Sequence, residues 1–188
     1  MKNIKQITVA VASVAAFALC LAPLSVAEEA SAPGTLSFKA SNKIYSAEGK
    51  FESWHFTKVD IPDGDLEKAT AELEVDLASV WEKAEDLAKH LRQADFFNVA
   101  KFATATVKIH GASKTGEMTY DATATVDFHG YSVDVPVSFK VVGKSPLKIE
   151  GTATLQRTAF GIGGEHDPSN DRSITDDVAI SLSATLDY

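Results

Sequence analysis

Alternation of apolar and polar residues with a period of two is the feature that most limits how this chain can fold. It is clearest in MTYDATATVDF (118–128), where apolar or small residues take every second position and threonine or aspartate the positions between. Successive side chains of a β-strand point to opposite faces, so this pattern is typical of a strand with one buried face. The same pattern recurs in TAELEVDLA (70–78), SVDVPVSFKV (132–141), LKIEGTATLQR (147–157) and VAISLSATLDY (178–188).

Three weaker segments complete the set of strands that the sequence predicts. They are Thr35–Ser41, Ile44–Thr57 with a kink at Gly49, and Phe102–His110. Eight long antiparallel strands with one apolar face form a sandwich or a closed barrel, and closure removes both exposed edges. We therefore predict an all-β fold, an eight-stranded antiparallel β-barrel.

The predicted interior of this barrel contains many small residues. The inward parity holds Ala71, Ala122, Ala124, Gly151, Ala153 and Ala184. An eight-stranded barrel is about wide enough for packed side chains or for one small ligand, so small inward residues would leave room for a ligand. Outward Glu, Asp, Thr and Ser argue against a barrel whose outer face meets lipid.

One helix is predicted to interrupt the strands and to lie over one mouth of the barrel. Ser79 and Glu82 have the spacing of a capping box, and apolar residues then recur at three and four positions. These signals predict a helix from about Val80 to Gln93. Phe96 and Phe97 follow it, and because neighbouring side chains point in different directions we expect one to meet the helix and the other the lumen.

The first 27 residues have the features of a secretory signal peptide. Lys2 and Lys5 precede an almost uncharged apolar run, and Ser25-Val26-Ala27 supplies small residues for cleavage. An uncleaved membrane anchor is the less favoured alternative, because the run is barely long enough to span a bilayer. Residues 28–34 then predict a flexible lead-in and residues 35–188 the barrel domain. We expect a periplasmic or secreted protein with no stable membrane insertion after cleavage.

Charge restricts the partners that the mature chain would have. The full chain carries a formal charge of −8, and loss of Lys2 and Lys5 with the leader would make the rest two units more negative. An acidic surface without a basic stripe argues against nucleic acid and against anionic membrane surfaces as partners. The single cysteine, Cys20, would leave with the leader, so the mature chain would form no disulfide.

The run HLRQADFFNVAKFATATV (90–107) resembles a motif of the YceI-like family of bacterial secreted proteins. That family has a helix ending in Leu-x-x-x-Asp-Phe-Phe and then a Lys-aromatic-x-Thr strand start, which is matched by Leu91, Asp95, Phe96, Phe97, Lys101, Phe102 and Thr104. VDFHGYSVDVPV (126–137) resembles the family's His-Gly hairpin, and LQRTAFGI (155–162) resembles its Asn-Arg-x-x-Phe-Gly-Ile segment. The chain departs from the pattern at Asn42, where a histidine is usual, and at Ala103, where a proline is usual. The resemblance covers essentially the whole mature chain.

The resemblance implies a lipocalin-like barrel that sequesters a long-chain isoprenoid lipid, such as a polyprenyl phosphate or a quinone-like lipid, with no covalent chemistry and no cofactor. Burial of a long apolar chain is favourable by roughly 25 cal/mol per Å², so an apolar tunnel needs few polar contacts. The candidate ligand-binding residues are Phe38, Phe51, Trp54, Leu91, Phe96, Phe97, Phe102, Phe128, Phe139, Ala153, Leu155, Arg157 and Phe160.

Two other classes of function stay open. The phenylalanines could pack a filled core in a structural or protein-interaction module, for which FESWHF (51–56) is the candidate exposed patch, although this segment could equally form a gate over the tunnel. An enzyme acting on isoprenoids is less favoured, because the strands supply few inward ionisable groups. Whether the barrels form a homodimer stays open for every one of these functions.

Arg157 is the most informative polar residue, since it continues the inward parity of the strand that holds Ala153 and Leu155. A buried guanidinium needs a partner. We expect it to pair with an internal carboxylate such as Asp95 or Asp177, and the alternative is contact with the head group of a ligand.

Signals for catalysis and metal binding are weak. The five histidines are scattered without a His-Glu-x-x-His spacing, and Gly-x-Ser-x-Gly does not occur. The loop GGEHDPSNDRS (163–173) is rich in oxygen ligands but lacks the spacing of an EF-hand, so a solvated connection is favoured over a calcium site.

Overall fold

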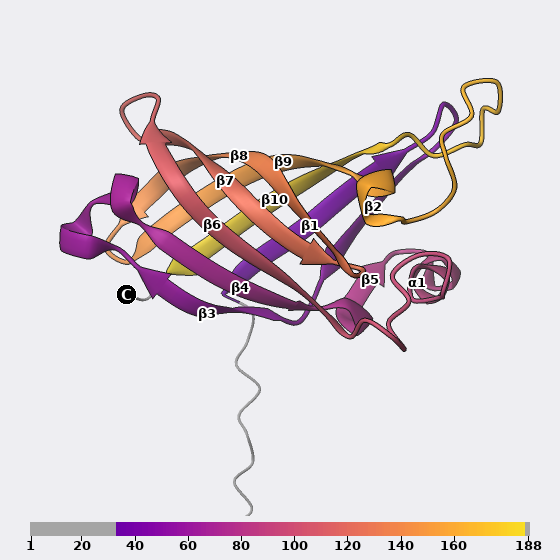
Figure 1. The fold of residues 1–188 in the computed structure, drawn as a ribbon, viewed down its shortest axis with the longest axis horizontal. Helices are drawn as coiled ribbons and strands as arrows, with labels where there is room; N and C mark the ends of the chain where they lie inside the picture. The colour runs from indigo at the N-terminus through magenta and orange to yellow at the C-terminus, as the bar shows by residue number, and fades with distance from the viewer. Residues whose placement is uncertain (1–32, 187–188) are drawn as a thin grey trace, which may run out of the picture.

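Antiparallel strand pairing dominates the computed structural model of the chain, which describes residues 33–186 (Figure 1). The expected signal peptide, residues 1–27, lies outside the described residues, as does most of the expected lead-in. Gly34, expected in the lead-in, instead begins the first strand.

Ten strands form one antiparallel sheet. They are β1 (Gly34–Ser41), β2 (Ser46–Phe51), β3 (Trp54–Asp60), β4 (Thr70–Asp76), β5 (Val80–Glu82), β6 (Thr104–Lys114), β7 (Thr119–Phe128), β8 (Tyr131–Lys144), β9 (Leu147–Gln156) and β10 (Asp177–Leu186). Their order in the sheet is β3-β4-β6-β7-β8-β9-β10-β1-β2-β5. The prediction of an all-β antiparallel fold is confirmed, with ten strands in place of eight.

The difference in strand number arises from two bent chain segments. β2 and β3 are two halves of one bent segment, and β4 and β5 are halves of another that pairs with it. Between the halves, Glu52 N–H donates to the Ser79 carbonyl at 3.2 Å and Asp76 N–H donates to the Ser53 carbonyl at 3.0 Å. Antiparallel pairing therefore continues around the bend, and the ten strands amount to eight passes of the chain.

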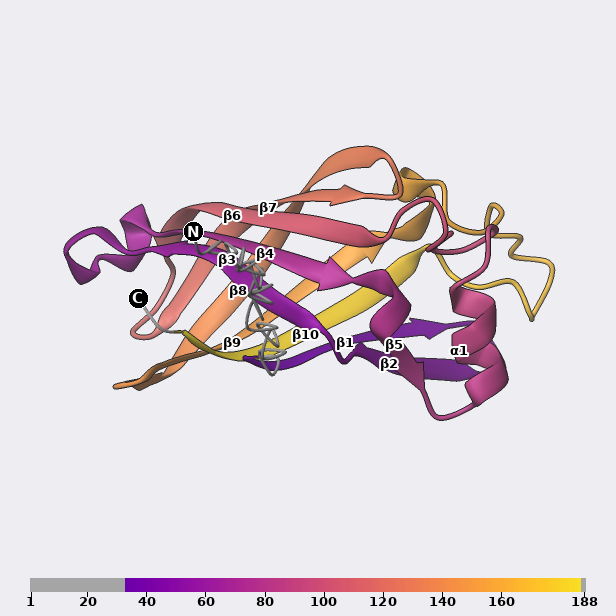
Figure 2. The ribbon, with the colours of Figure 1, turned by 90° about the horizontal axis from the view of Figure 1, so that it is seen from below.

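The bent segments also curl the sheet into a barrel. β1 pairs with β2, whereas β3 pairs with β4 at the other side of the sheet. Because β2 runs directly into β3, and β4 continues into β5, both bent segments connect one side of the sheet with the other. Figures 1 and 2 show the resulting elongated barrel with its strands steeply tilted.

The bend in the second pass lies at Glu52-Ser53, so the predicted kink at Gly49 is wrong. Gly49 pairs in register with Phe38 of β1 and with Glu82 of β5. A Cβ added to Gly49 would lie 2.4 Å from Cζ of Phe38. The position requires glycine because an aromatic ring lies against the backbone there, which is a common reason for glycine inside a strand.

The helix is much shorter than predicted. α1 spans Glu85–Leu91, and residues Val80–Glu82 form β5, paired with β2. The capping box is wrong because both of its side chains have other partners: the Ser79 hydroxyl accepts from Ser53 N–H and donates to the Asp76 carbonyl, while Glu82 accepts from Ala84 N–H. Strand pairing at the bend thus overrides the local helical signal.

The two ends of the barrel are built differently. At one end, called the α1 end, lie α1, the β1–β2 turn, the short helix η4 (Arg157–Phe160) and the loop of residues 161–176 (Figure 2). At the other, called the η2 end, lie η1 (Pro62–Gly64) and η2 (Leu66–Lys68). A further short helix, η3 (Leu77–Ser79), makes the bend between β4 and β5.

Buried apolar side chains form three clusters along the barrel. The largest, at the α1 end and in the adjoining middle, includes Val80, Leu91, Phe97, Val126 and Phe160. The second, at the bend, holds Trp54, Leu73, Val75 and Ala184, and the third, toward the η2 end, holds Val141, Leu147 and Leu186. Inward residues of the long strands belong to these clusters with the parity that the sequence predicts.

Candidate functional site

An apolar cavity of about 420 Å³ lies inside the barrel. Its wall extends from Ile61 and Leu66 at the η2 end to Leu87 and His90 of α1. Polar side chains in this wall are few: Thr70, His90, Ser138, Thr152 and Arg157. Ligand-binding pockets generally measure about 300–1,000 Å³ and are lined mainly by apolar groups, so this cavity has the size and the composition of a site for an apolar small molecule.

Inward side chains around the cavity are apolar but not fully buried. Val137, Phe139, Ala153, Leu155 and Ile180 all line the cavity and all keep partial access to solvent. In a filled core these positions would be packed on every side, as protein interiors normally are. The partial accessibility therefore comes from the lumen itself, which these side chains border.

A chain of aromatic rings packs at the α1 end of the cavity. Phe97 has its ring centroid 6.4 Å from that of Phe38, 5.9 Å from Phe51 and 5.6 Å from Phe128. Phe128 lies 5.6 Å from Phe160. These distances are typical of favourable aromatic packing. All five rings are part of the cavity wall.

Phe96 and Phe97 point to different surroundings. Phe97 is 9% exposed and packs among the rings of the lumen. Phe96 is half-buried, and its ring centroid lies 4.8 Å from that of His90 on α1. The structure therefore places one ring in the lumen and the other against the helix, and both line the cavity.

Most of the residues that the sequence singles out as ligand-binding come together around this cavity. Phe38, Phe51, Leu91, Phe96, Phe97, Phe128, Phe139, Ala153, Leu155, Arg157 and Phe160 line it. Two others do not. Trp54, 1% exposed, packs in the cluster at the bend, 5.7 Å from the Phe56 ring, and Phe102 packs 4.7 Å from the His129 ring.

The burial of Trp54 tests whether the segment FESWHF forms an exposed apolar patch. Its indole is buried, and its Nε1 has no hydrogen-bond partner among the described residues. Phe51 and Phe56 are half-buried and line the cavity. This segment therefore does not form the exposed apolar patch that the alternative of a protein-interaction module requires, because the bend between β2 and β3 turns all three rings inward.

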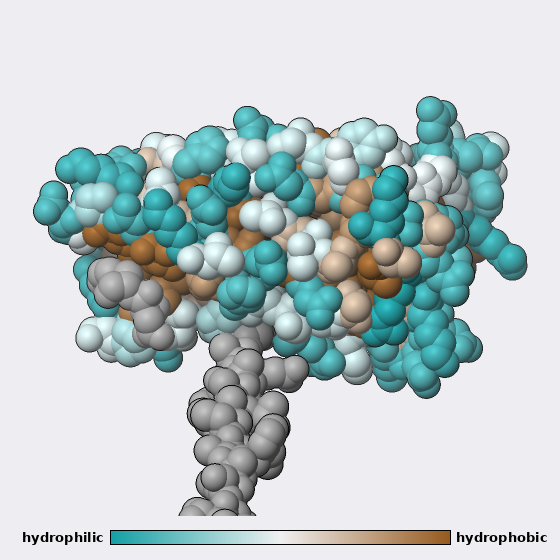
Figure 3. Space-filling view, turned by 60° about the horizontal axis from the view of Figure 1, so that its bottom comes forward, coloured by the Kyte–Doolittle hydropathy of each residue, from teal (hydrophilic) through white to brown (hydrophobic). Residues whose placement is uncertain are grey.

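Several wall residues were not predicted because they lie outside the alternating strands. Val59, Ile61 and Leu66 come from the end of β3 and from η2, Leu87 and His90 from α1, and Ile162 and Ile174 from the loop after η4. For Ile61 and Ile174 the sequence signal is an isolated isoleucine in an otherwise polar stretch, IPDG (61–64) and SITDD (173–177), whereas Leu87 and His90 lie in the predicted helix. Figure 3 shows a brown apolar strip near the η2 end on a face that is otherwise mostly teal and white.

Arg157 has no carboxylate partner within ion-pair distance among the described residues, so the predicted pairing with Asp95 or Asp177 is wrong. It is 7% exposed, and its guanidinium donates to four backbone carbonyls: Ile162 at 2.7 Å, Gly164 at 2.6 Å, Ile174 at 2.9 Å and Thr175 at 3.0 Å. Asp95 instead lies 3.7 Å from His90 Nε2, and Asp177 accepts from the Gln156 amide.

The arginine thus fastens both ends of the 161–176 loop beside the cavity. Its side chain starts from η4, because β9 ends one residue earlier. Two of the acceptor carbonyls, those of Ile162 and Gly164, lie at the start of the loop. The other two, those of Ile174 and Thr175, lie at its end. Five donors in a planar fork allow a guanidinium to bind several carbonyls at once.

Ionisable groups with a clearly shifted pKa lie on the surface, away from the cavity. The N–H of Glu67, and to a smaller degree Lys68, lower the pKa of Asp65 below its usual value, and the hydroxyl and N–H of Ser169 lower the pKa of Asp167. Neither carboxylate belongs to the cavity wall. Within residues 33–186, no group of three or more His, Cys, Asp or Glu side chains is placed to hold a metal ion.

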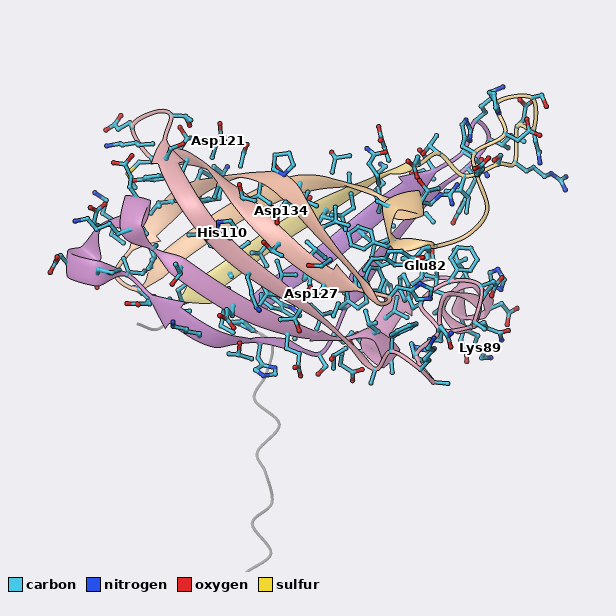
Figure 4. The ribbon with its side chains drawn as sticks, in the orientation of Figure 1. Glu82, Lys89, His110, Asp121, Asp127 and Asp134 are labelled. Atoms are coloured by element: carbon cyan, nitrogen blue, oxygen red, sulfur yellow. The ribbon has the colours of Figure 1, made fainter. Side chains whose placement is uncertain are left out.

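The outer face of β6, β7 and β8 carries the polar half of the alternating pattern (Figure 4). His110 Nε2 lies 3.1 Å from the Thr125 hydroxyl, which donates to Asp134 at 2.6 Å. On the same face Ser138 donates to Asp121 at 2.7 Å. Cross-strand pairs of this kind stabilise the sheet on its solvent side.

Of the helices in the described part of the chain, none has the length and apolar character needed to cross a membrane.

Comparison with known proteins identifies relatives of the whole domain. A profile of the YceI-like domain matches residues 27–186. A Pseudomonas fluorescens protein named UPF0312 is 34% identical over 158 residues, which is 78% of this chain and 78% of that protein. The crystal structure of Burkholderia cenocepacia BcnA superposes with a TM-score of 0.73 at 18% identity, covering 82% of this chain and 96% of that one. A polyisoprenoid binding domain from Saccharophagus degradans, implicated in plant cell wall breakdown, gives a TM-score of 0.56 at 16% identity, covering 84% and 97%.

Proposed function

This chain belongs to the YceI-like family, and we propose that it binds a long-chain isoprenoid lipid in the barrel cavity and stores or transports it without chemical change. The observation that carries this proposal is the partial accessibility of inward apolar residues such as Val137, Ala153 and Ile180, which border an unfilled lumen. The resemblance to a solved polyisoprenoid binding domain supports the isoprenoid as the class of lipid.

The composition of the cavity wall supports binding of the apolar chain rather than catalysis. Of its described residues, only His90 and Arg157 carry ionisable side chains, and the four hydrogen bonds of Arg157 to backbone carbonyls hold its guanidinium in place. A general acid or base needs a positioned partner at the reacting atom. Removal of apolar area from water, at roughly 25 cal/mol per Å², is the main source of affinity in such a site.

The proposal also includes the compartment. The apolar leader and small cleavage residues of the sequence support export to the periplasm or the exterior. A lipid that must cross an aqueous compartment needs a protein that shields its chain from water, and the elongated barrel provides such a shield (Figure 1).

Native mass spectrometry of the protein produced from the full chain, followed by organic extraction, tests this function. We expect a stoichiometric adduct with the mass of an isoprenoid lipid. Protein that is recovered without an adduct and that also fails to take up a quinone or a polyprenyl phosphate from detergent would contradict the proposal.

A further inference from the structure

Four of the five large apolar side chains that are most exposed to solvent lie toward one end of the barrel. In the described part of the chain, the exposed large apolar residues are Ile44 (69% exposed), Tyr45 (56%), Trp81 (45%), Tyr131 (52%) and Val142 (50%). The first four lie in the β1–β2 turn, in β5 and at the start of β8, all at the α1 end (Figures 1 and 2). Only Val142 lies toward the η2 end. We call Ile44, Tyr45, Trp81 and Tyr131 the mouth rim.

The tip of the mouth rim is held in its exposed position by polar contacts. The Asn42 side chain accepts from the N–H groups of Ile44 and Tyr45, at 2.9 and 2.7 Å, and donates to the Arg172 carbonyl. Lys43 donates to the Pro168 carbonyl and pairs with Asp171 at 2.9 Å. The turn is therefore fixed against the 161–176 loop with its two apolar side chains pointing into water. Apolar side chains that gather at the surface can form an interaction surface.

Part of the cavity wall lies at the same end of the barrel as the mouth rim. Ala40 and Ala47 flank the β1–β2 turn, Ile174 lies in the 161–176 loop and His90 lies on α1, and all four line the cavity while keeping solvent access. A ligand that leaves the cavity at this end passes between the elements that carry the rim. Whatever surface covers the rim would therefore receive the ligand directly.

The chemistry of the rim fits the interface of a lipid bilayer. Tryptophan and tyrosine favour the region between head groups and acyl chains, and isoleucine favours the acyl chains. Lys50 Nζ lies 5.1 Å from the centroid of the Trp81 ring, and the same ammonium group pairs with Glu52. The long side chain of Lys50 thus packs beside the aromatic ring while its charge is neutralised by the carboxylate. Lys43 and Lys89 are likewise paired with carboxylates. A rim with balanced charges suits zwitterionic head groups better than strongly anionic ones.

We propose that the mouth rim docks on the surface of a lipid bilayer, so that the cavity opens against the membrane and lipid passes between the two. The proposal rests on the function above in one respect, that the cargo is a membrane lipid. Docking is driven by apolar insertion of Ile44, Tyr45, Trp81 and Tyr131, and it does not require a basic patch.

Flotation of the protein with phosphatidylcholine vesicles tests the docking. The variants are Ile44→Glu and Trp81→Glu, alone and combined, and the matched control is Val142→Glu, which adds the same charge at an exposed apolar position of the opposite end. We expect the combined variant to lose about tenfold or more of the vesicle-bound fraction, and Val142→Glu to stay within about twofold of the natural protein. Circular dichroism checks that each variant is folded.

Three results would overturn the docking proposal: no binding of the natural protein to the vesicles, equal loss of binding in Val142→Glu, or binding that needs anionic lipid and disappears at high salt. Analysis of the lipid content of the same samples separates this proposal from the proposed function. If the protein carries lipid but does not bind vesicles, the docking proposal is contradicted and the proposed function is not. If the protein binds vesicles but carries no lipid and takes none up, the proposed function is contradicted and docking is not.

Discussion

The ring of Phe97 meets the ring of Phe38 edge-on, with centroids 6.4 Å apart and planes inclined by 80°. The contact joins the segment that follows α1 to the first strand of the barrel. It fixes the end of the lumen, because Phe51 and Phe128 pack against the same ring of Phe97. The order of this end of the cavity thus depends on one side chain held among strands that are distant in sequence.

Phe97→Ala should destabilise the protein far more than Phe96→Ala. Phe97 is buried among three other rings, and truncation of a buried phenylalanine costs about 3–5 kcal/mol. Phe96 is half-buried, so we expect less than about half of that loss for its truncation. Urea unfolding followed by tryptophan fluorescence measures both. Equal losses would contradict the separate roles of the two rings.

Gly49→Ala should destabilise the barrel although glycine is usually a poor strand residue. The new methyl group would lie 2.4 Å from the Phe38 ring, and overpacking of this kind costs about 1–3 kcal/mol. Gly151→Ala is the control, because its methyl group would meet its neighbours at an ordinary 3.6 Å or more. Thermal unfolding compares the two. A melting temperature that is unchanged in Gly49→Ala would mean that the Phe38 ring can move aside.

Ala153→Phe should fill the lumen and lower lipid retention by about tenfold or more while leaving most of the fold intact. Ala153 lies inside the cavity wall, paired with Val137 and Ile180. Thr154→Phe places the same ring on the outer face of the same strand, where Thr154 is exposed, and should leave retention unchanged. Extraction and mass analysis of bound lipid give the comparison. Full retention in a folded Ala153→Phe protein would contradict the position of the binding site.

Arg157→Met should loosen the 161–176 loop before it affects the barrel. Loss of the guanidinium would leave the carbonyls of Ile162, Gly164, Ile174 and Thr175 without this donor, and an unsatisfied buried polar group costs about 1–3 kcal/mol. Arg172→Met, at an exposed position of the same loop, is the control.

Hydrogen exchange measures this effect locally. Faster exchange of amides in residues 161–176, with β8 and β9 still protected, is the expected pattern for Arg157→Met. Unchanged exchange in the loop would show that its order does not depend on the arginine.

Local pattern was sufficient to predict which residues of the long strands face inward. In β9, Ile149, Ala153 and Leu155 line the cavity as their alternation predicts. This succeeds because the side-chain period of a strand is a property of the backbone alone. The motif that resembles the YceI-like family placed Phe96 and Phe97 next to a helix, and the structure agrees.

Only the tertiary structure decided where strands bend and which partners polar groups take. The Ser79-Glu82 spacing favours a helix locally, but pairing with β2, formed by residues some thirty positions earlier, turns Val80–Glu82 into a strand. For the same reason Trp54, predicted to contact a ligand, lies in the core outside the cavity wall, since the bend at Glu52-Ser53 is fixed by hydrogen bonds to Ser79 and from Asp76.

Arg157 marks the same division between sequence and structure. Its parity predicted an inward guanidinium, and the side chain is indeed buried beside the cavity. Its partners are backbone carbonyls of a loop that has no periodic pattern, and side-chain sequence says nothing about where such carbonyls point. Periodicity and composition therefore determined the barrel and its apolar lining, whereas hydrogen bonds between distant segments decided its bends, its closure and the setting of its one buried arginine.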